Sequence, residues 1–172
     1  MRPASPSQDS GAESASTITR STFIAMAARF SDLVPHGRDL GMSVEWVGAD
    51  EARLRLPFRD CLLGDTAKGR VYTSVLYSLA DAASGVAVFC ALGEFVSIAT
   101  LDLRMDYLRP TPAGRDIVAE ARCYRLSRQI AFTRCTLRLS DDDEIRAIAT
   151  GTFICGDRRS DLGLPEGVEG RV

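Results

Sequence analysis

The stretch GRVYTSVLYSLADAASGVAVFCAL, from Gly69 to Leu92, decides the fold of this 172-residue chain. Its apolar residues recur with the period of an α-helix, about 3.6 residues, which predicts one long helix from about Thr73 to Leu92. Thr73 is a candidate N-cap, and Gly93 is a candidate C-terminal stop. Most of this helix is expected to be buried, yet it carries an acidic residue, Asp81, near its middle.

The two faces of the predicted helix differ in chemistry. With about 100° of rotation per residue, the residues expected to face the core are Val75, Leu76, Leu79, Ala82, Ala83, Val86 and Cys90. The residues of the opposite face are Ser74, Tyr77, Ser78, Asp81, Ser84, Gly85 and Val88. This second face holds no Lys, Arg or Glu, which predicts close approach by a second subunit or a ligand. Asp81 is then either a half-exposed carboxylate satisfied by a serine hydroxyl, or a general base or nucleophile in a partly desolvated cleft.

The segments before the helix are predicted to be a tail, a short helix, a hairpin and a loop. Residues 1–19 are rich in Ser, Ala and Pro and are expected to form a disordered tail. Apolar residues at helical spacing within residues 20–34 predict a short amphipathic helix that is ended by Pro35. Two alternating runs within residues 40–58 predict a β-hairpin, and residues 59–70 predict a polar loop.

Four strand-like runs follow the helix, at residues 97–108, 115–126, 128–140 and 145–155. The first run alternates, so Leu101 and Leu103 are expected on one face and Thr100 on the other. A hairpin, a long helix and a four-strand meander predict an α+β fold, in which one long central helix is wrapped by a highly curved antiparallel sheet of about six strands. We expect this domain to span residues 20–156, and residues 157–172 to form a loose tail.

Composition narrows the class of function. The chain is 45% hydrophobic and 26% charged with a formal net charge of −2, so nothing favours binding to nucleic acid or to a membrane. No uninterrupted apolar run reaches the roughly 18 residues of a membrane span, and no secretory signal is expected. The five cysteines form no CxxC pair, four lie in apolar segments, and we expect buried, reduced thiols in a cytoplasmic protein. The only histidine, His36, lies far from any cysteine in sequence, so we expect no metal site and a surface or gate role without chemistry for His36.

Three segments together resemble the hot-dog thioesterases of the phenylacetic-acid-degradation (PaaI) type. These segments are SLADAASGVAV (78–88), IATLDLRMDYLRPTPAGRDIVAEARCYR (98–125) and ATGTF (149–153). The resemblance covers about residues 40–154 and implies a long helix wrapped by an antiparallel sheet, as the residue pattern also predicts. It further implies homodimers or dimers of dimers that hydrolyse acyl-CoA thioesters. No metal or organic cofactor is implied, since coenzyme A is part of the substrate.

The resemblance assigns chemistry to particular residues. Asp81 matches the family's catalytic carboxylate, which activates water or attacks the thioester carbonyl. Thr100 matches a Ser or Thr that helps to place the water. Ser84, on the same face of the helix as Asp81, is expected to contact substrate. Basic residues at strand ends, among them Arg109 and Arg128, are expected to bind the phosphates of coenzyme A.

The sequence departs from the family at the start of the helix. The family's His-Gly-Gly motif is replaced by Tyr72, Thr73 and Ser74, and its usual upstream asparagine falls at Thr66. We expect the backbone N–H of Ser74 to act as the oxyanion donor, because it lies at the positive end of the helix. Tyr72, Thr73 and Thr66 are expected to contact the substrate.

The spacing of Ser74 and Asp81 adds a constraint that does not depend on the resemblance. They are seven residues apart on one helix, which is about 10 Å along the helix axis and too far for both to act on one carbonyl. We therefore expect an obligate homodimer in which each site takes Ser74 from one chain and Asp81 from the other.

The leading interpretation is an enzyme, a cytoplasmic acyl-CoA thioesterase that hydrolyses an aromatic or medium-chain acyl thioester to the free acid and CoA. The alternative is a non-catalytic acyl-CoA-binding protein of the same fold, because the His-Gly-Gly motif is absent. A hot-dog dehydratase is disfavoured because its usual histidine has no counterpart in this sequence. A DNA-binding regulator is disfavoured because no recognition-helix domain remains once the tails are set aside.

Overall fold

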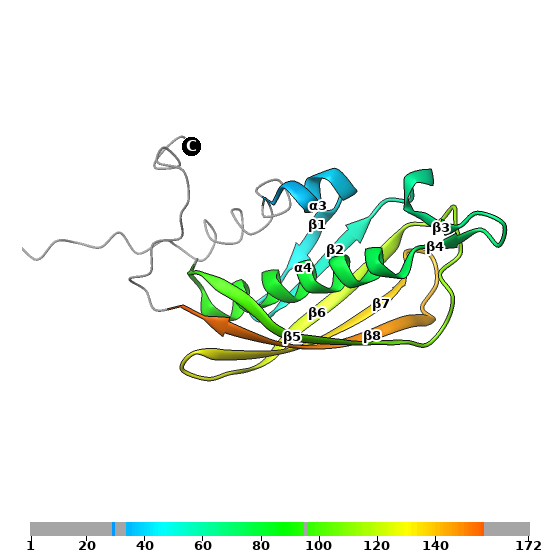
Figure 1. The fold of residues 1–172 in the computed structure, drawn as a ribbon. Coiled ribbons are helices and arrows are strands. Elements are labelled where there is room, and N and C mark those ends of the chain that lie inside the picture. Colours follow the sequence, from blue (N-terminus) through cyan, green and yellow to red (C-terminus); the bar gives the residue numbers. More distant parts are fainter. Residues whose placement is uncertain (1–28, 30–33, 95, 157–172) are drawn as a thin grey trace, which may run out of the picture.

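The computed structural model of this chain describes residues 29, 34–94 and 96–156. The short N-terminal helix and the two tails predicted from the sequence fall almost entirely outside these residues, so they stay predictions. The described residues form one long helix against a six-stranded antiparallel sheet. Figure 1 shows the helix lying along one face of the curved sheet. The predicted α+β architecture is therefore confirmed.

A short helix and a hairpin precede the long helix. Helix α3 (Pro35–Leu40) begins at Pro35. The helix that Pro35 was expected to end lies almost entirely outside the described residues, so that expectation stays a prediction. Proline suits the first helical position because its φ is already helical and it has no N–H to satisfy. Gly41 ends α3 with a φ of 76°, a left-handed conformation that glycine adopts without strain. Strands β1 (Ser43–Val47) and β2 (Glu51–Leu56) then form the predicted antiparallel hairpin.

The loop predicted before the long helix has more structure than expected. It contains a single 3₁₀ turn (Asp60–Leu62) and two strands, β3 (Leu63–Asp65) and β4 (Arg70–Val71), which form a separate two-stranded sheet. Tyr72 donates its backbone N–H to a carbonyl of the 3₁₀ turn at 2.9 Å. Its ring covers Gly64, where an added Cβ would lie 2.6 Å from Tyr72 Cδ2. Tyr72 is thus held against this small sheet at the entrance to the helix.

The long helix α4 (Thr73–Leu92) has the predicted bounds. Gly93 ends it with a φ of 68° and donates its N–H to the Phe89 carbonyl at 2.9 Å. Tyr72 rather than Thr73 occupies the N-cap position, and its side chain makes no capping hydrogen bond. By length and by a mean hydropathy of 1.8, α4 could cross a membrane, contrary to the expectation that no segment would qualify. However, 67% of its most apolar window is buried inside the domain, as in the core helix of a globular protein.

The main sheet has the strand order β1-β2-β6-β7-β8-β5, and every neighbouring pair is antiparallel. Its last four strands in sequence are β5 (Ile98–Tyr107), β6 (Ile117–Leu126), β7 (Ile130–Leu139) and β8 (Ile145–Cys155). The core lies between the sheet and α4, and its fully buried side chains include Leu54, Leu76, Leu79, Ile117 and Leu137. Strands β1 and β5 form the two edges of the sheet.

Edge strand β5 does not keep the predicted alternation. Its register against β8 shifts between Thr100 and Asp102, which places a β-bulge at Leu101. Leu101 was expected to face the core with Leu103, but Leu101 is 56% exposed, whereas Leu103 is 7% exposed. An extra residue in a strand changes which side the following residues face. As a result Leu103 packs into the core under α4 while Thr100 also points at α4, through a hydrogen bond to Asp81.

The predicted faces of α4 are confirmed in its first half only. The core stripe is buried except for Ala82, which is half-buried. On the opposite face, the accessible residues are Ser74, Tyr77, Ser78 and Asp81. The last three residues of that face, Ser84, Gly85 and Val88, were expected to be approached by a second subunit or a ligand, but they are buried within the domain. The curved sheet covers them, since an added Cβ on Gly85 would lie 3.6 Å from Ile98 Cδ1 and Val88 packs in one cluster with Phe153.

Candidate active site

A cavity of about 440 Å³ lies beside the middle of α4, bordered by α3 and by the start of β5. Its polar side chains are those of His36, Tyr77, Ser78, Asp81 and Thr100. Its apolar lining includes Met42, Ala82, Gly85, Ile98 and Phe153. A concave, mostly apolar chamber with a few convergent polar groups is the usual form of a small-ligand site. This cavity is therefore the candidate active site.

The two residues expected to carry the chemistry meet in this cavity. Thr100 Oγ1 donates a hydrogen bond to Asp81 Oδ1 at 2.8 Å. Asp81 comes from the third turn of α4, and Thr100 comes from β5, just before the bulge at Leu101. Asp81 is half-buried, and within the described residues no Lys or Arg forms an ion pair with it. The second carboxylate oxygen is thus available to a water or a ligand in the cavity.

His36 is a cavity residue that the sequence reasoning missed. It was expected to lie at the surface without a chemical role, and its side chain is indeed exposed. Its Nε2 atom, however, forms a hydrogen bond with Ser78 Oγ at 3.1 Å, one helical turn before Asp81. The two partners are 42 residues apart in sequence, so no local pattern connects them. The only local signal is Pro35, which starts the short helix that carries His36 over α4.

The start of α4 lies apart from Asp81 within one chain. The N–H groups of the first helical turn have no partner inside the helix, and no side chain caps them. Ser74 is exposed and does not line the cavity of Asp81. Thr73 instead lines a second cavity of about 330 Å³, together with Tyr107 and Arg109. A single protomer therefore does not bring the expected oxyanion donor to the expected base.

Two tyrosines, one in α4 and one in β5, donate hydrogen bonds to backbone carbonyls. Tyr77 donates its hydroxyl to the Leu103 carbonyl at 2.9 Å, and Tyr107 donates its hydroxyl to the Thr73 carbonyl at 3.3 Å. Burial, with a smaller contribution from nearby Tyr77, raises the pKa of Tyr107. Both hydroxyls therefore join α4 to β5, and the raised pKa keeps the Tyr107 hydroxyl protonated at neutral pH.

The remaining expected substrate contacts are scattered. Arg109 lines the second cavity and pairs with Glu144 at 2.9 Å. Arg128 lies in the β6–β7 turn, at the opposite end of the sheet from Arg109. The two ends are about 30 Å apart, because β5 runs between them for ten residues. Thr66 is exposed in the turn between β3 and β4. Ser84 is fully buried and lies outside the lining of the candidate site, so it is left out of the site.

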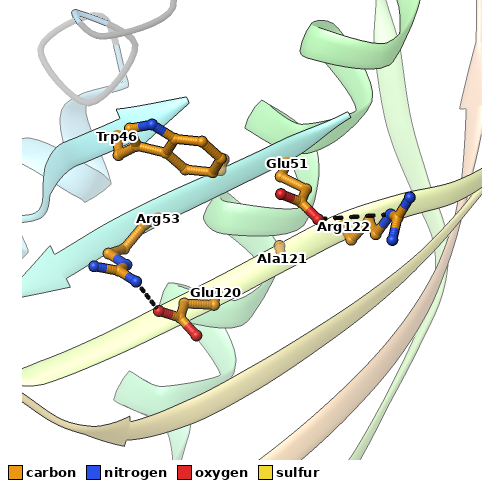
Figure 2. A pocket seen from close by; sticks show the side chains of 7 residues that line it. Trp46, Glu51, Arg53, Glu120, Ala121 and Arg122 are labelled. Carbon is orange, nitrogen blue, oxygen red and sulfur yellow. Dashed lines mark ion pairs between the residues drawn. The ribbon is translucent and has the colours of Figure 1, made fainter. Parts of the chain in front are cut away.

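A larger hollow, of about 520 Å³, lies on strands β2 and β6 near Trp46 (Figure 2). Two ion pairs cross it, between Arg53 and Glu120 at 2.5 Å and between Arg122 and Glu51 at 3.6 Å. Burial opposes ionisation of Glu120, but a hydrogen bond from Arg138 and the charge of Arg53 outweigh it and lower the pKa of that carboxyl. Paired carboxylates of this kind are poor general bases. This hollow is therefore not the candidate active site.

Comparisons of the sequence point to thioester chemistry. The model of the thioesterase superfamily matches residues 68–146. A candidate esterase of Halobacterium salinarum is 37% identical over 101 residues, which cover 57% of this chain and 66% of that protein, just under two thirds of its length. The medium/long-chain acyl-CoA thioesterase YigI of Escherichia coli is 29% identical over 136 residues, which cover 72% of this chain and 86% of YigI.

Comparisons of the fold agree. A solved structure of a Pseudomonas aeruginosa protein has a TM-score of 0.69 and 31% identity, and the match covers 77% of this chain and 98% of that chain. The phenylacetic acid degradation protein PaaI of Thermus thermophilus has a TM-score of 0.62 and 30% identity, over 70% of this chain and 98% of that chain. With the central helix, the strand order and the sequence match in agreement, this chain belongs to the hot-dog thioesterase superfamily and has PaaI proteins among its structural relatives.

Proposed function

We propose that this protein is an acyl-CoA thioesterase that hydrolyses an aromatic or medium-chain acyl thioester to the free acid and CoA. The observation that carries the proposal is the Asp81–Thr100 hydrogen bond at the wall of a mostly apolar cavity. The cavity offers apolar surface to an acyl group beside a carboxylate that has one oxygen free. We place the enzyme in the cytoplasm, because all five of its cysteines are free thiols.

The hydrogen bond between Thr100 and Asp81 determines how a water would be held. Thr100 has one hydroxyl proton and gives it to Asp81, so toward water it can only accept. A water between Asp81 Oδ2 and Thr100 Oγ1 then points both of its protons at these acceptors. Its lone pair is left to face a thioester carbonyl, and Asp81 takes the proton as the bond forms. Direct attack by the carboxylate is the other course, and single turnover in ¹⁸O-labelled water separates the two by label in the Asp81 side chain.

A homodimer completes the proposed site. The outer side of β5 pairs with no strand among the described residues, and its exposed apolar side chains include Leu101 and Tyr107. Pairing β5 with the same strand of a second copy continues the sheet and sets the two α4 helices side by side in opposite directions. The Ser74 N–H of one copy then serves the Asp81 of the other as oxyanion donor. The dimer, alone or as a dimer of dimers, is part of the proposal.

A non-catalytic acyl-CoA-binding protein is the second candidate. It is favoured by one observation, that Tyr72, Thr73 and Ser74 stand where the family motif has His-Gly-Gly. Ser74 keeps the backbone N–H, but it adds a Cβ and a hydroxyl at the point where the thioester oxygen must approach. Such a protein would bind acyl-CoA without releasing thiol.

Thiol release from a panel of aromatic and aliphatic acyl-CoAs tests the proposal. The purified wild type should release thiol from at least one of them, and Asp81→Asn should abolish the release. The matched control is Asp143→Asn, which changes an exposed carboxylate in the β7–β8 turn. Tight binding without release at any chain length would establish the second candidate instead.

A further inference from the structure

We propose that His36 is a second catalytic residue of this cavity, which gives a proton to the sulfur of the departing thiol. The proposal rests on the proposed hydrolysis at Asp81. His36 is the only histidine of the chain, and it lines the same cavity as Asp81 although no chemical role was expected for it. The geometry of α3, the proton carriers of the cavity and the balance of the reaction each support it.

Helix α3 holds His36 at a defined place over α4. His36 Nε2 and Ser78 Oγ form a hydrogen bond of 3.1 Å. Ser78 and Asp81 are three residues apart on α4, so their side chains are neighbours on one face of the helix. The imidazole and the carboxylate therefore approach the same volume from sites one helical turn apart. A thioester seated with its carbonyl at Asp81 has its sulfur within reach of the imidazole.

The cavity contains few groups that can exchange a proton near neutral pH. No Lys or Arg is among the residues that line it, and its hydroxyls on Tyr77 and Thr100 already donate to the Leu103 carbonyl and to Asp81. Asp81 and His36 are the remaining titratable side chains of the lining. A carboxylate accepts a proton there, and an imidazole is the side chain best suited to donate one at neutral pH. The cavity thus offers one base and one acid.

The reaction balances with these two groups. Asp81 takes one proton from water, whose oxygen bonds to the thioester carbonyl carbon. The carbon–sulfur bond then breaks, and its electron pair leaves on sulfur. Protonated His36 gives its Nε2 proton to that sulfur, directly or through Ser78 Oγ, and the free thiol departs. The proton held by Asp81 returns to the imidazole through water, so one thioester and one water give one acid and one thiol.

A purely structural role for His36 is the competing interpretation. Other contacts already hold α3 in place. Arg59 donates to the Asp39 carbonyl, and Gly37 within α3 and Met42 just after it are buried. His36 itself is exposed. Docking of α3 therefore does not rest on the imidazole alone. A purely structural role predicts that any loss of activity on removing the imidazole is the same whatever thiol leaves.

Variants at His36 separate these interpretations. His36→Gln can keep a hydrogen bond to Ser78 but cannot transfer a proton, and His36→Ala loses both. We expect each to lower kcat/KM on the best acyl-CoA by about 100-fold, and added imidazole to restore activity to His36→Ala. Arg38→Ala, an exposed change on the same helix, is the matched control and should match the wild type. Thermal unfolding of all variants checks that each is folded.

The acidity of the leaving thiol gives the decisive measurement. Two small thioesters with the same acyl group are compared, one of N-acetylcysteamine, whose thiolate needs a proton, and one of 4-nitrothiophenol, whose thiolate leaves without one. Both His36 variants should be strongly impaired on the first and close to wild type on the second. Equal loss on both esters, or full activity of His36→Gln, would overturn the proposal. If the wild type releases no thiol from any ester, the proposed function fails. If the wild type is active and the His36 variants are equally active on both esters, the proposed function stands and this inference alone fails.

Discussion

The two halves of α4 differ sharply although they belong to one continuous helix. In the first half, residues 73–82, the side turned away from the core is accessible and carries the polar groups of the candidate site. In the second half, eight consecutive residues, 83–90, are all buried, and of these only Gly85 lines the cavity. The first half displays side chains, and the second half anchors the helix that displays them.

The difference arises from the sheet rather than from the helix. Ile98 at the start of β5 and Phe153 on β8 cover the second half. The cavity is lined mainly by the first half of α4, from Tyr77 to Ala82, and it reaches Gly85 in the second half. Asp81 lies at the boundary between the two halves and is half-buried. Its carboxylate therefore remains accessible, while the apolar residues near it can contact an acyl chain. Substitutions in the second half should therefore affect folding, and substitutions in the first half should affect chemistry.

An aspartate introduced into each half of α4 should change the free energy of unfolding in opposite directions. Val86→Asp places a carboxylate at a fully buried position and should lower the free energy of unfolding by about 4 kcal/mol or more. Ser74→Asp places it in the exposed first turn, where the positive helix end should raise the free energy of unfolding by about 0.3–1 kcal/mol. Urea unfolding followed by circular dichroism measures both, and equal destabilisation would contradict the contrast between the halves.

At the boundary between the two halves, replacing Asp81 should lower the catalytic rate without lowering the free energy of unfolding. Asp81→Asn removes the proposed base but keeps an oxygen that accepts the Thr100 hydroxyl. We expect kcat/KM on the best acyl-CoA to fall by about 10²- to 10⁴-fold, and the free energy of unfolding to change by less than about 0.5 kcal/mol. Steady-state kinetics and urea unfolding on the same preparation test this. A loss of activity that merely follows a loss of stability would argue against a catalytic role for Asp81.

Thr100 should have a smaller effect of the same kind. Thr100→Val keeps the shape of the side chain but removes the hydroxyl that bonds Asp81 at 2.8 Å. A hydrogen bond to a charged group contributes about 1.5–3 kcal/mol, so we expect kcat to fall at least about tenfold. Thr150→Val, an exposed change on β8, is the matched control. Wild-type kcat in Thr100→Val would remove Thr100 from the proposed water site.

The sequence predicts those features of the fold that local patterns encode. The apolar period and Gly93 are sufficient for the bounds of α4, and alternation is sufficient for the hairpin. The bulge at Leu101 depends on the register with β8, more than 40 residues away, so the strand's own alternation predicts the wrong side for that residue. The burial of Ser84 was missed for a related reason, because a helical wheel assumes one covered face and the curved sheet covers two.

The candidate site divides in the same way. Asp81 and Thr100 were found because a motif places them, and the structure brings them together at 2.8 Å. His36 was missed because its place is set by the docking of α3 on α4, a contact between distant segments. The neighbouring Pro35 indicates where α3 starts, but not where α3 docks. Side chains that reach a site across the fold need coordinates before they can be assigned to it.

The smallest expected effect is at Ser84, in the anchoring half of α4. Its side chain is 0% exposed, and its Oγ atom has no hydrogen-bond partner among the described residues. A buried hydroxyl without a partner costs stability, and alanine is the better helix former. Ser84→Ala should therefore raise the free energy of unfolding by up to about 1 kcal/mol and leave kcat/KM unchanged, as urea unfolding and thiol-release assays would measure. If Ser84→Ala instead lowered kcat/KM without loss of stability, the hydroxyl would have a partner in the bound state. Ser84 would then return to the site, and the division of α4 into displaying and anchoring halves would have to be moved by at least one turn.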